Sequence, residues 1–435
     1  MLKRLNNNKS YVEIKDASFP SPFISGLEYS APARGCWNIV HTGMLIPEAH
    51  QIFVCAAGCL RGVVLTAAEM NATERFSTIE IKEKNVLDGD MESLILDGVE
   101  EIINNLPYTP KAILLYTSCI HHFMASDTNY VFSVLKDKYP DIMFTDCYMN
   151  PIMRKSGLNP DQTMRKQLYS LLKPSELNKK QINILGNDIP TDSDAEFVTM
   201  FKNGGYEIKD ITVCNSFDDY QSMAGSFLNI VYYPSALPAA KALKERLGQE
   251  YIYLPQSFDF DTNERYIKTL YNLFQLPQPD IDELRTKCSD RLNKLSETLS
   301  GTEVYIDYTA FPRPFELAKL LVKYGIFVTR IYADSISEEE KDAFFALKNS
   351  NIKIYPTVNA WMRVENRHNI KKAVAIGQKA AYFNSSSHFV NIVEGGGLWG
   401  FSGIIKLCDE IENAFNYEKD TRKLIQIKGL GCGCC

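Results

Sequence analysis

Long apolar runs are absent from this sequence. No window approaches the roughly 18 uninterrupted apolar residues that a membrane-spanning helix needs. The first residues, MLKRLNNNKSYVEIKD, include early basic residues with no apolar segment behind them, so they do not predict a signal peptide. A basic excess is lacking too, because 47 Lys and Arg face 53 Asp and Glu, for a net charge of −6. Nucleic-acid-binding proteins usually carry a basic face, so we do not expect this protein to bind nucleic acid. Without a membrane-spanning run or a signal peptide, we expect a cytoplasmic protein that does not bind a membrane.

Signatures of nucleotide hydrolysis and of nucleophilic catalysis are also missing. The pattern G-x(4)-G-K-[ST] does not occur, so any ATP hydrolysis linked to this protein belongs to a partner. No G-x-S-x-G motif occurs either. The segment EGGGLWG, residues 394–400, does match G-x-G-x-x-G, but no strand is expected after the helix that follows it. We therefore expect a tight turn lining a substrate cavity rather than a dinucleotide site, with anion binding at the helix start left open.

Short apolar runs alternate with amphipathic stretches along the chain, which predicts an α/β fold with parallel sheets. Each run is rich in β-branched or aromatic residues and closes on Gly, Pro, Asn or Ser. The predicted strands begin at His50, Lys111, Asp141, Lys180, Tyr206, Leu228, Glu250, Thr302, Gly325, Asn351 and Lys379. The clearest predicted helices begin at Met91, Ala236, Pro314 and Ser402.

Two segments have the composition of connectors. Residues 171–180 carry Pro and charges before a new strand, and residues 292–303 end a long helix with Ser-Gly. A chain of 435 residues is also longer than one hydrophobic core usually holds. We therefore predict three stacked, doubly wound Rossmann-like domains: an N-terminal domain of residues 1–175, a middle domain of residues 176–297 and a C-terminal domain of residues 298–435.

Cysteine is the residue type that this chain has in unusual number. There are eleven cysteines, and because cytosolic thiols stay reduced, a disulfide framework is not expected. Cys214, Cys288 and Cys408 each stand alone on a predicted strand or helix. Lone cysteines are commonly buried as small hydrophobic residues, so we interpret these three as structural.

Three other cysteines lie where a metal site is expected. Cys59 and Cys119 follow predicted strands, and Cys36 lies in a Gly-flanked loop before the first of these strands. Because the carboxyl ends of parallel strands share one edge of a sheet, these residues can converge there. Thiolates are soft ligands that suit iron–sulfur clusters, zinc or copper(I). Zinc usually takes tight cysteine pairs and Cys55 with Cys59 has no second pair nearby, so the spacing favours a cluster, with zinc and with structural or redox thiols left open.

The cysteine segments RGCWNIVHTG, VCAAGCLRGV and TSC together resemble component 1 of the nitrogenase family. That family includes nitrogenase, its cofactor-assembly scaffold, protochlorophyllide reductase and the nickel-tetrapyrrole cyclase of methanogens. Its three cluster cysteines match Cys36, Cys59 and Cys119. The segment STIEIKEKNVLDGDMESLILDGVEEI resembles the family's acidic loop and helix, and GLWGFSGIIKLCDEIENAF resembles its terminal helix.

The resemblance implies a function as well as a fold. It implies an iron–sulfur cluster, 4Fe-4S or a larger shared one, held at a subunit interface by Cys36, Cys59 and Cys119. The chain would form a homodimer, or a heterodimer with a related subunit. An ATP-dependent iron protein would deliver electrons, and this chain would be the oxidoreductase subunit that passes them to a small or tetrapyrrole-like substrate.

Two departures from the family's pattern bear on the substrate. In nitrogenase the catalytic metallocofactor is held by a cysteine of the middle domain and a histidine late in the last domain. The comparable middle stretch here, YLPQSFDFDTNE, has no cysteine, and Trp399 stands where the histidine would fall. We therefore expect no dinitrogen reduction. A non-catalytic metallocofactor scaffold or carrier and an α/β small-molecule binder stay as alternative functions.

Several residues near the cysteines keep two interpretations. Cys55 or the partner subunit could supply a fourth ligand, but a buried strand cysteine is favoured for Cys55 and for Cys147. His121 and His122 could donate a proton or a hydrogen bond to the cluster, although a histidine held by backbone or solvent is favoured. The tail KGLGCGCC, with Cys432, Cys434 and Cys435, could bind a metal or be a solvated terminus with reactive thiols.

Overall fold

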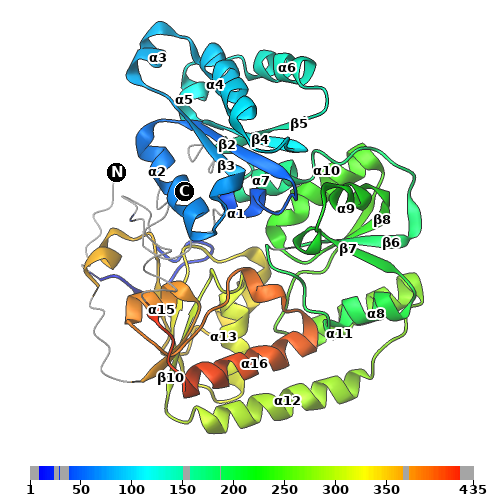
Figure 1. The fold of residues 1–435 in the computed structure, drawn as a ribbon. Coiled ribbons are helices and arrows are strands. Elements are labelled where there is room, and N and C mark those ends of the chain that lie inside the picture. The colour runs from blue at the N-terminus through cyan, green and yellow to red at the C-terminus, as the bar shows by residue number, and fades with distance from the viewer. Residues whose placement is uncertain are drawn as a thin grey trace. The chain divides into compact units, whose positions relative to one another are not determined.

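The computed structural model describes residues 9–23, 29, 39–149, 157–186, 188–365 and 372–421. The chain divides into two compact units, each assembled from separate stretches of sequence. The two-sheet unit consists of the described residues within 35–190 and 207–254, and the one-sheet unit of those within 1–34, 191–206 and 255–429. Figure 1 labels the helices and strands of each unit. The domain boundaries at residues 175 and 297 stay a prediction.

Two parallel four-stranded sheets form the framework of the two-sheet unit. The N-terminal sheet has the order β3-β2-β4-β5, and the middle sheet has the order β7-β6-β8-β9. The strand bounds are β2 Ala49–Cys55, β3 Phe76–Glu80, β4 Ala112–Ser118, β5 Met143–Met149, β6 Asn178–Leu185, β7 Glu207–Asp210, β8 Ser226–Val231 and β9 Glu250–Tyr253. Every residue of β2 and of β4 is buried, as expected for parallel strands covered on both faces.

Helices cover both faces of the N-terminal sheet. Alternate residues of β2 explain this, because Phe53 packs with α1, α2 and α7 while Ile52 packs with α4 and α6. Figure 1 shows these two layers. The helix bounds in this unit are α1 Ile39–Gly43, α2 Ala57–Glu69, α3 Glu83–Asp88, α4 Met91–Asn105, α5 Cys119–Phe123, α6 Thr128–Lys138, α7 Pro160–Leu168, α9 Phe217–Ser222 and α10 Leu237–Leu247.

The one-sheet unit is built on a sheet of order β1-β12-β11-β10-β13-β14. Its strands are parallel except β1, which pairs antiparallel with β12. The strand bounds are β1 Val12–Glu13, β10 Glu303–Asp307, β11 Val328–Tyr332, β12 Lys353–Tyr355, β13 Ala373–Ile376 and β14 Phe389–Val390. The helix bounds are α8 Glu196–Asn203, α11 Phe260–Phe274, α12 Ile281–Thr298, α13 Pro314–Lys323, α14 Lys341–Ala346, α15 Gln378–Asn384 and α16 Gly400–Asn416.

The fold class predicted from the sequence, α/β with parallel sheets, is confirmed, and one predicted strand is wrong. The run from Lys379 lies in helix α15, and the strand of this region, β13, comes just before it. Gly377, with φ +108°, separates the two. A short apolar run buried on all sides has no periodicity that distinguishes a helix from a strand, which explains the error.

Another difference concerns the segment that resembles an acidic loop and helix. Its first residues form strand β3, on one edge of the N-terminal sheet, and the short helix α3 follows before α4 begins at Met91. The predicted helix from Met91 is confirmed. Strands β1, β13 and β14 were also not predicted.

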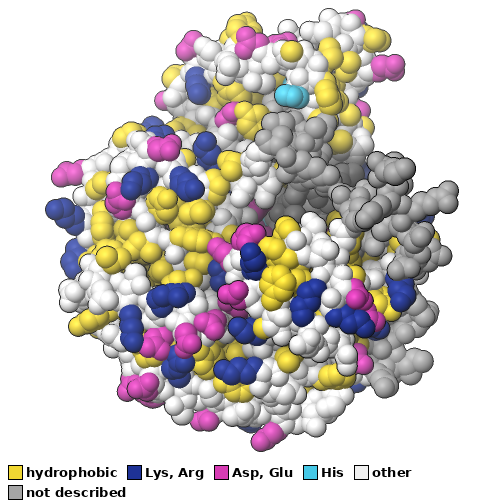
Figure 2. All heavy atoms as spheres, turned by 180° about the vertical axis from the view of Figure 1, so that it is seen from behind, with side chains coloured by type: hydrophobic (Ala, Val, Ile, Leu, Met, Phe, Trp, Pro, Cys, Tyr) yellow, Lys and Arg dark blue, Asp and Glu magenta, His cyan; other side chains and the backbone are white. Residues whose placement is uncertain are grey.

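One face of the molecule shows how the charged side chains are distributed. On the face drawn in Figure 2, Lys and Arg side chains are interspersed with Asp and Glu among the atoms that are coloured by type. No helix in the described part of the chain is long and apolar enough to cross a membrane.

Candidate metal centre and neighbouring cavity

Two of the three predicted cluster cysteines begin helices at the same crevice of the N-terminal sheet. In the order β3-β2-β4-β5, the chain turns to one side after β2 and to the other side after β4. The carboxyl ends of such a strand pair form the crevice where open α/β sheets place their ligands. Cys59 is the third residue of α2, which follows β2, and Cys119 is the first residue of α5, which follows β4.

The strand register brings the two helix starts next to each other. β2 and β4 are hydrogen-bonded neighbours, with Phe53 opposite Tyr116 near their carboxyl ends. Cys59 and Cys119 are both partly exposed. Two thiols at neighbouring strand ends suit a soft metal or a cluster, as the sequence predicted.

The third predicted ligand, Cys36, lies outside the described residues, as do Cys432, Cys434 and Cys435. Within the described ranges, no group of three or more His, Cys, Asp or Glu side chains is placed to hold a metal ion. Cys59 and Cys119 therefore offer two donors, and a further thiolate is required for a cluster site. The set Cys36, Cys59 and Cys119 stays a prediction.

Cys55 and Cys147 are fully buried in the apolar core of the two-sheet unit. Burial raises the pKa of the Cys147 thiol well above its ordinary value, and the thiol lies beside the Tyr116 hydroxyl. A thiolate is therefore disfavoured at Cys147. The burial of both residues agrees with the interpretation of strand cysteines in a core.

Of the three lone cysteines that the sequence predicts to be buried, two are buried in the structure. Cys288 of α12 and Cys408 of α16 are buried, and their helices pack together. Burial raises the pKa of Cys408 to about 12. Cys214 is half-buried, and its Sγ donates to the Asp210 carbonyl at 3.4 Å.

A cavity of about 430 Å³ lies beside Cys119, at the carboxyl ends of β4 and β5. Its wall includes Thr117 and His121 from the end of β4 and from α5, Tyr148 from β5, and Thr163 from α7. His122 also lines it and is exposed. The volume is in the range of small-molecule sites. The sequence drew attention to the two histidines, but the cavity is lined by residues from five elements, β4, α5, α6, β5 and α7, and has no sequence signature.

His121 is held in one orientation by the turn that begins α5. The Ser118 backbone N–H donates to Nδ1 of His121 at 3.0 Å, in a capping-box arrangement. Only 3% of His121 is exposed, and burial lowers the pKa of its imidazole. Because Nδ1 accepts a hydrogen bond, the proton of the neutral ring is on Nε2. The predicted backbone partner is confirmed, and Nε2 is left as a donor.

The glycine segment near the C-terminus forms a tight turn, as predicted, while its place in the wall of a substrate cavity stays a prediction. The helix start after this turn is already occupied. Gly400, with φ +71°, begins α16. The buried carboxylate of Glu196, from α8 of the same unit, accepts from the Ser402 N–H at 2.7 Å. A Cβ atom on Gly400 would overlap with Oε2 of Glu196. The chain's own carboxylate therefore occupies the position where an external anion would bind, which the sequence had left open.

The crevice of the sheet in the one-sheet unit is also filled by a carboxylate of the chain. It lies between the carboxyl ends of β10 and β13. Asp307 is fully buried there, and it accepts from the N–H groups of Thr309 at 2.8 Å and of Ala380 at 2.9 Å. A Cβ atom on Gly377 would overlap with the same carboxylate. Of these two crevices, the one at the N-terminal sheet is the one that carries thiols.

Trp399, which stands where the resemblance led us to expect a histidine, is a core residue. It is fully buried, with its ring edge-on to Phe197 at 5.1 Å between centroids and stacked with Tyr266 at 6.2 Å. The middle stretch that lacks a cysteine also has a structural role. Its Asp259 caps helix α11 by accepting a hydrogen bond from the Thr262 N–H. These contacts explain both segments as structure.

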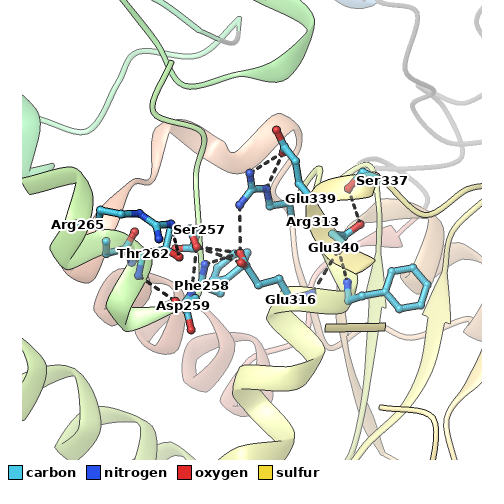
Figure 3. A network of polar contacts seen from close by, with 12 residues as sticks. Ser257, Phe258, Asp259, Thr262, Arg265, Arg313, Glu316, Ser337, Glu339 and Glu340 are labelled. Carbon is cyan, nitrogen blue, oxygen red and sulfur yellow. Dashed lines mark hydrogen bonds and ion pairs between the residues drawn. The ribbon is translucent and has the colours of Figure 1, made fainter. Parts of the chain in front are cut away.

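A second group of buried carboxylates surrounds the start of α13 (Figure 3). Glu340 accepts from the N–H groups of Phe315 at 2.7 Å and Glu316 at 3.2 Å, and burial raises its pKa to about 8. The Glu316 carboxylate accepts from the Phe258 N–H at 2.8 Å and lies 3.7 Å from Arg313. Perturbed pKa values mark functional sites in some proteins, but here the hydrogen bonds cap a helix and tie a loop to it, so we interpret the group as structural.

Comparisons with known proteins identify relatives of this chain. The sequence model described as nitrogenase component 1 type oxidoreductase matches residues 40–416. A solved structure described as nitrogenase Cp1 at pH 6.5 is similar, with a TM-score of 0.67 and 16% identity, covering 91% of this chain and 94% of that one. A second, nitrogenase Cp1 at pH 5, has a TM-score of 0.59 and 14% identity, covering 90% of each chain. No curated protein matches the sequence significantly.

Proposed function

Because the chain belongs to the nitrogenase component 1 type oxidoreductases, we propose that it accepts electrons through an iron–sulfur cluster held by Cys36, Cys59 and Cys119. The observation that carries the proposal is the position of Cys59 and Cys119 at neighbouring helix starts in the crevice of a parallel sheet. Such a cluster, when bound, supplies one-electron transfer. The chain's own part is to hold the thiolates at a partly exposed edge, within reach of a third ligand.

The proposed donor is an ATP-dependent iron protein, since this chain has no phosphate-binding loop of the G-x(4)-G-K-[ST] type. The proposed assembly is a homodimer or a heterodimer with a related subunit. The proposed substrate is a small or tetrapyrrole-like organic molecule rather than dinitrogen. Support for this last point comes from Trp399, whose packing in the core leaves no histidine at that position.

Iron content tests the proposal directly. The protein is purified without oxygen, iron and acid-labile sulfide are measured, and the EPR spectrum is recorded with and without dithionite. We expect iron and sulfide in the wild-type protein and their loss in Cys36→Ala, Cys59→Ala and Cys119→Ala. Cys214→Ala is the matched control, because Cys214 is also partly exposed but lies at the middle sheet. No iron above trace after anaerobic reconstitution, or equal loss in the Cys214 variant, would contradict the proposal.

A metallocofactor scaffold or carrier is the second candidate function, favoured by the core position of Trp399. The two functions differ in turnover. Mixed with an iron protein and ATP, an oxidoreductase is reoxidised by its substrate through many cycles. A scaffold instead releases its metal to an acceptor protein, and its iron content falls as that of the acceptor rises.

A further inference from the structure

The cavity beside α5 contains two polar side chains whose hydrogen-bonding atoms have no partner. Nε2 of His121 and Oγ of Ser126 are both buried, and neither makes a hydrogen bond in the described part of the chain. Both residues line the cavity. Buried donors and acceptors are normally paired, because an unpaired one has lost its hydrogen bonds to water without replacing them. Two such atoms in the wall of one cavity indicate a ligand that pairs with them.

The chemistry of the wall limits what that ligand can be. No Asp, Glu, Lys or Arg is among the described residues that line the cavity. The Tyr148 hydroxyl is already used, because it donates to the Asp146 carboxylate at 2.5 Å. Ala125, Leu158 and Pro160 supply apolar surface. Among these described residues, a carboxylate or an ammonium group would find no opposite charge to pair with.

We propose that this cavity binds a small uncharged organic molecule through a carbonyl-type oxygen, which accepts a hydrogen bond from Nε2–H of His121 while Ser126 provides a second hydrogen bond. The geometry of the ring supports the direction of this bond. Because Nδ1 accepts from Ser118, Nε2 carries the proton and can only donate. The proposal concerns a ligand site, and it stands whether or not the neighbouring cysteines hold a cluster.

Benzamide is the uncharged probe. Benzoate and benzamidinium have nearly the same shape as benzamide but carry a negative and a positive charge, so they are the controls for charge. Binding to the anaerobically purified full-length chain is measured by saturation-transfer difference NMR. We expect benzamide to bind with a dissociation constant on the order of 1 mM, as suits a fragment of this size, and the two ions to bind at least about tenfold more weakly.

Two substitutions of His121 separate the proposed contact from the structural role of this residue. Glu and Gln are the usual capping-box residues at this position, so His121→Glu and His121→Gln both keep an acceptor for the Ser118 N–H. The free end of Gln is a donor, whereas the free end of Glu is an acceptor. We expect His121→Gln to bind benzamide within about threefold of wild type and His121→Glu to lose about tenfold or more.

Ser126→Ala and His122→Gln complete the test. Loss of the Ser126 hydroxyl is expected to weaken benzamide binding about three- to fivefold, and substitution of the exposed His122 to change it by less than about twofold. Circular dichroism confirms that each variant is folded. The proposal is overturned if benzamide does not bind, if benzoate binds equally well, or if His121→Glu and His121→Gln bind benzamide equally. The first outcome would mean that water alone satisfies the two atoms.

Discussion

Replacing Gly400 with Ala tests the conclusion that the glycine segment before α16 makes room for Glu196. The residue has φ +71°, a conformation that costs a non-glycine residue about 1–2 kcal/mol. Gly205, with φ +73°, has nothing within 4 Å of a built Cβ atom, so Gly205→Ala is a control with the same backbone conformation and no overlap. Both glycines belong to the one-sheet unit.

The additional cost at Gly400 follows from the contacts of Glu196. An added Cβ would overlap with Oε2, and the side chain, 3% exposed, has no solvent to move into. Displacing it breaks the hydrogen bond from the Ser402 N–H, and a bond to a charged group contributes about 1.5–3 kcal/mol. We therefore expect Gly400→Ala to cost about 2.5–5 kcal/mol in total, against about 1–2 kcal/mol for Gly205→Ala.

Hydrogen exchange of the α16 amides measures this difference without assuming that the whole chain unfolds in one step. Burial raises the pKa of Glu196 to about 7, so the measurement is made at pH 8, where the carboxylate is ionised. An extra 1.5–3 kcal/mol corresponds to exchange about 10- to 150-fold faster in Gly400→Ala than in Gly205→Ala. In a Glu196→Ala background the overlap disappears, and Gly400→Ala should cost no more than Gly205→Ala. Equal costs at the two glycines in the wild-type background would refute the reasoning.

Two further predictions concern buried ionisable groups. Burial raises the pKa of Glu340 to about 8 from an ordinary 4.5, so between these values the folded protein keeps a proton that the unfolded chain has lost, and stability should fall as the pH rises. Glu340→Gln keeps an oxygen that accepts from the N–H groups at the start of α13. The thermal unfolding temperature of this variant should therefore depend less on pH, between the two pKa values, than that of the wild-type protein. An unchanged pH dependence would contradict this prediction. In metal-free folded protein, iodoacetamide should modify the partly exposed Cys59 and Cys119 well before the buried Cys288 and Cys408. Peptide mass spectrometry measures the labelling rate of each cysteine. Equal rates for the exposed and the buried cysteines would contradict this prediction.

Most strands of both units could be predicted from the sequence, but β1, β3, β13 and β14 could not. Runs such as those beginning at His50 and Lys111 are apolar throughout because both faces of a parallel strand are covered. The run at Lys379 misled for the same reason, since complete burial removes the periodicity that separates a helix from a strand. The proposed cluster residues could be selected because cysteines after strands are a local signal, and their joint role stays a prediction.

Local features of this protein were therefore set by the sequence alone: alternating strands and helices, and thiols placed at strand ends. The tertiary structure decided what each local feature meets. Glu196 and Ser402 are 206 residues apart in the chain, yet their contact places a carboxylate of the chain at the helix start of α16. The unpaired atoms of His121 and Ser126 become a proposed ligand site only because α5, α6, α7 and two strands enclose one cavity. Hydrogen-bond pairing and burial depend on residues from distant segments of the chain. The sequence pattern along the chain does not show which of these segments come close to one another in the fold.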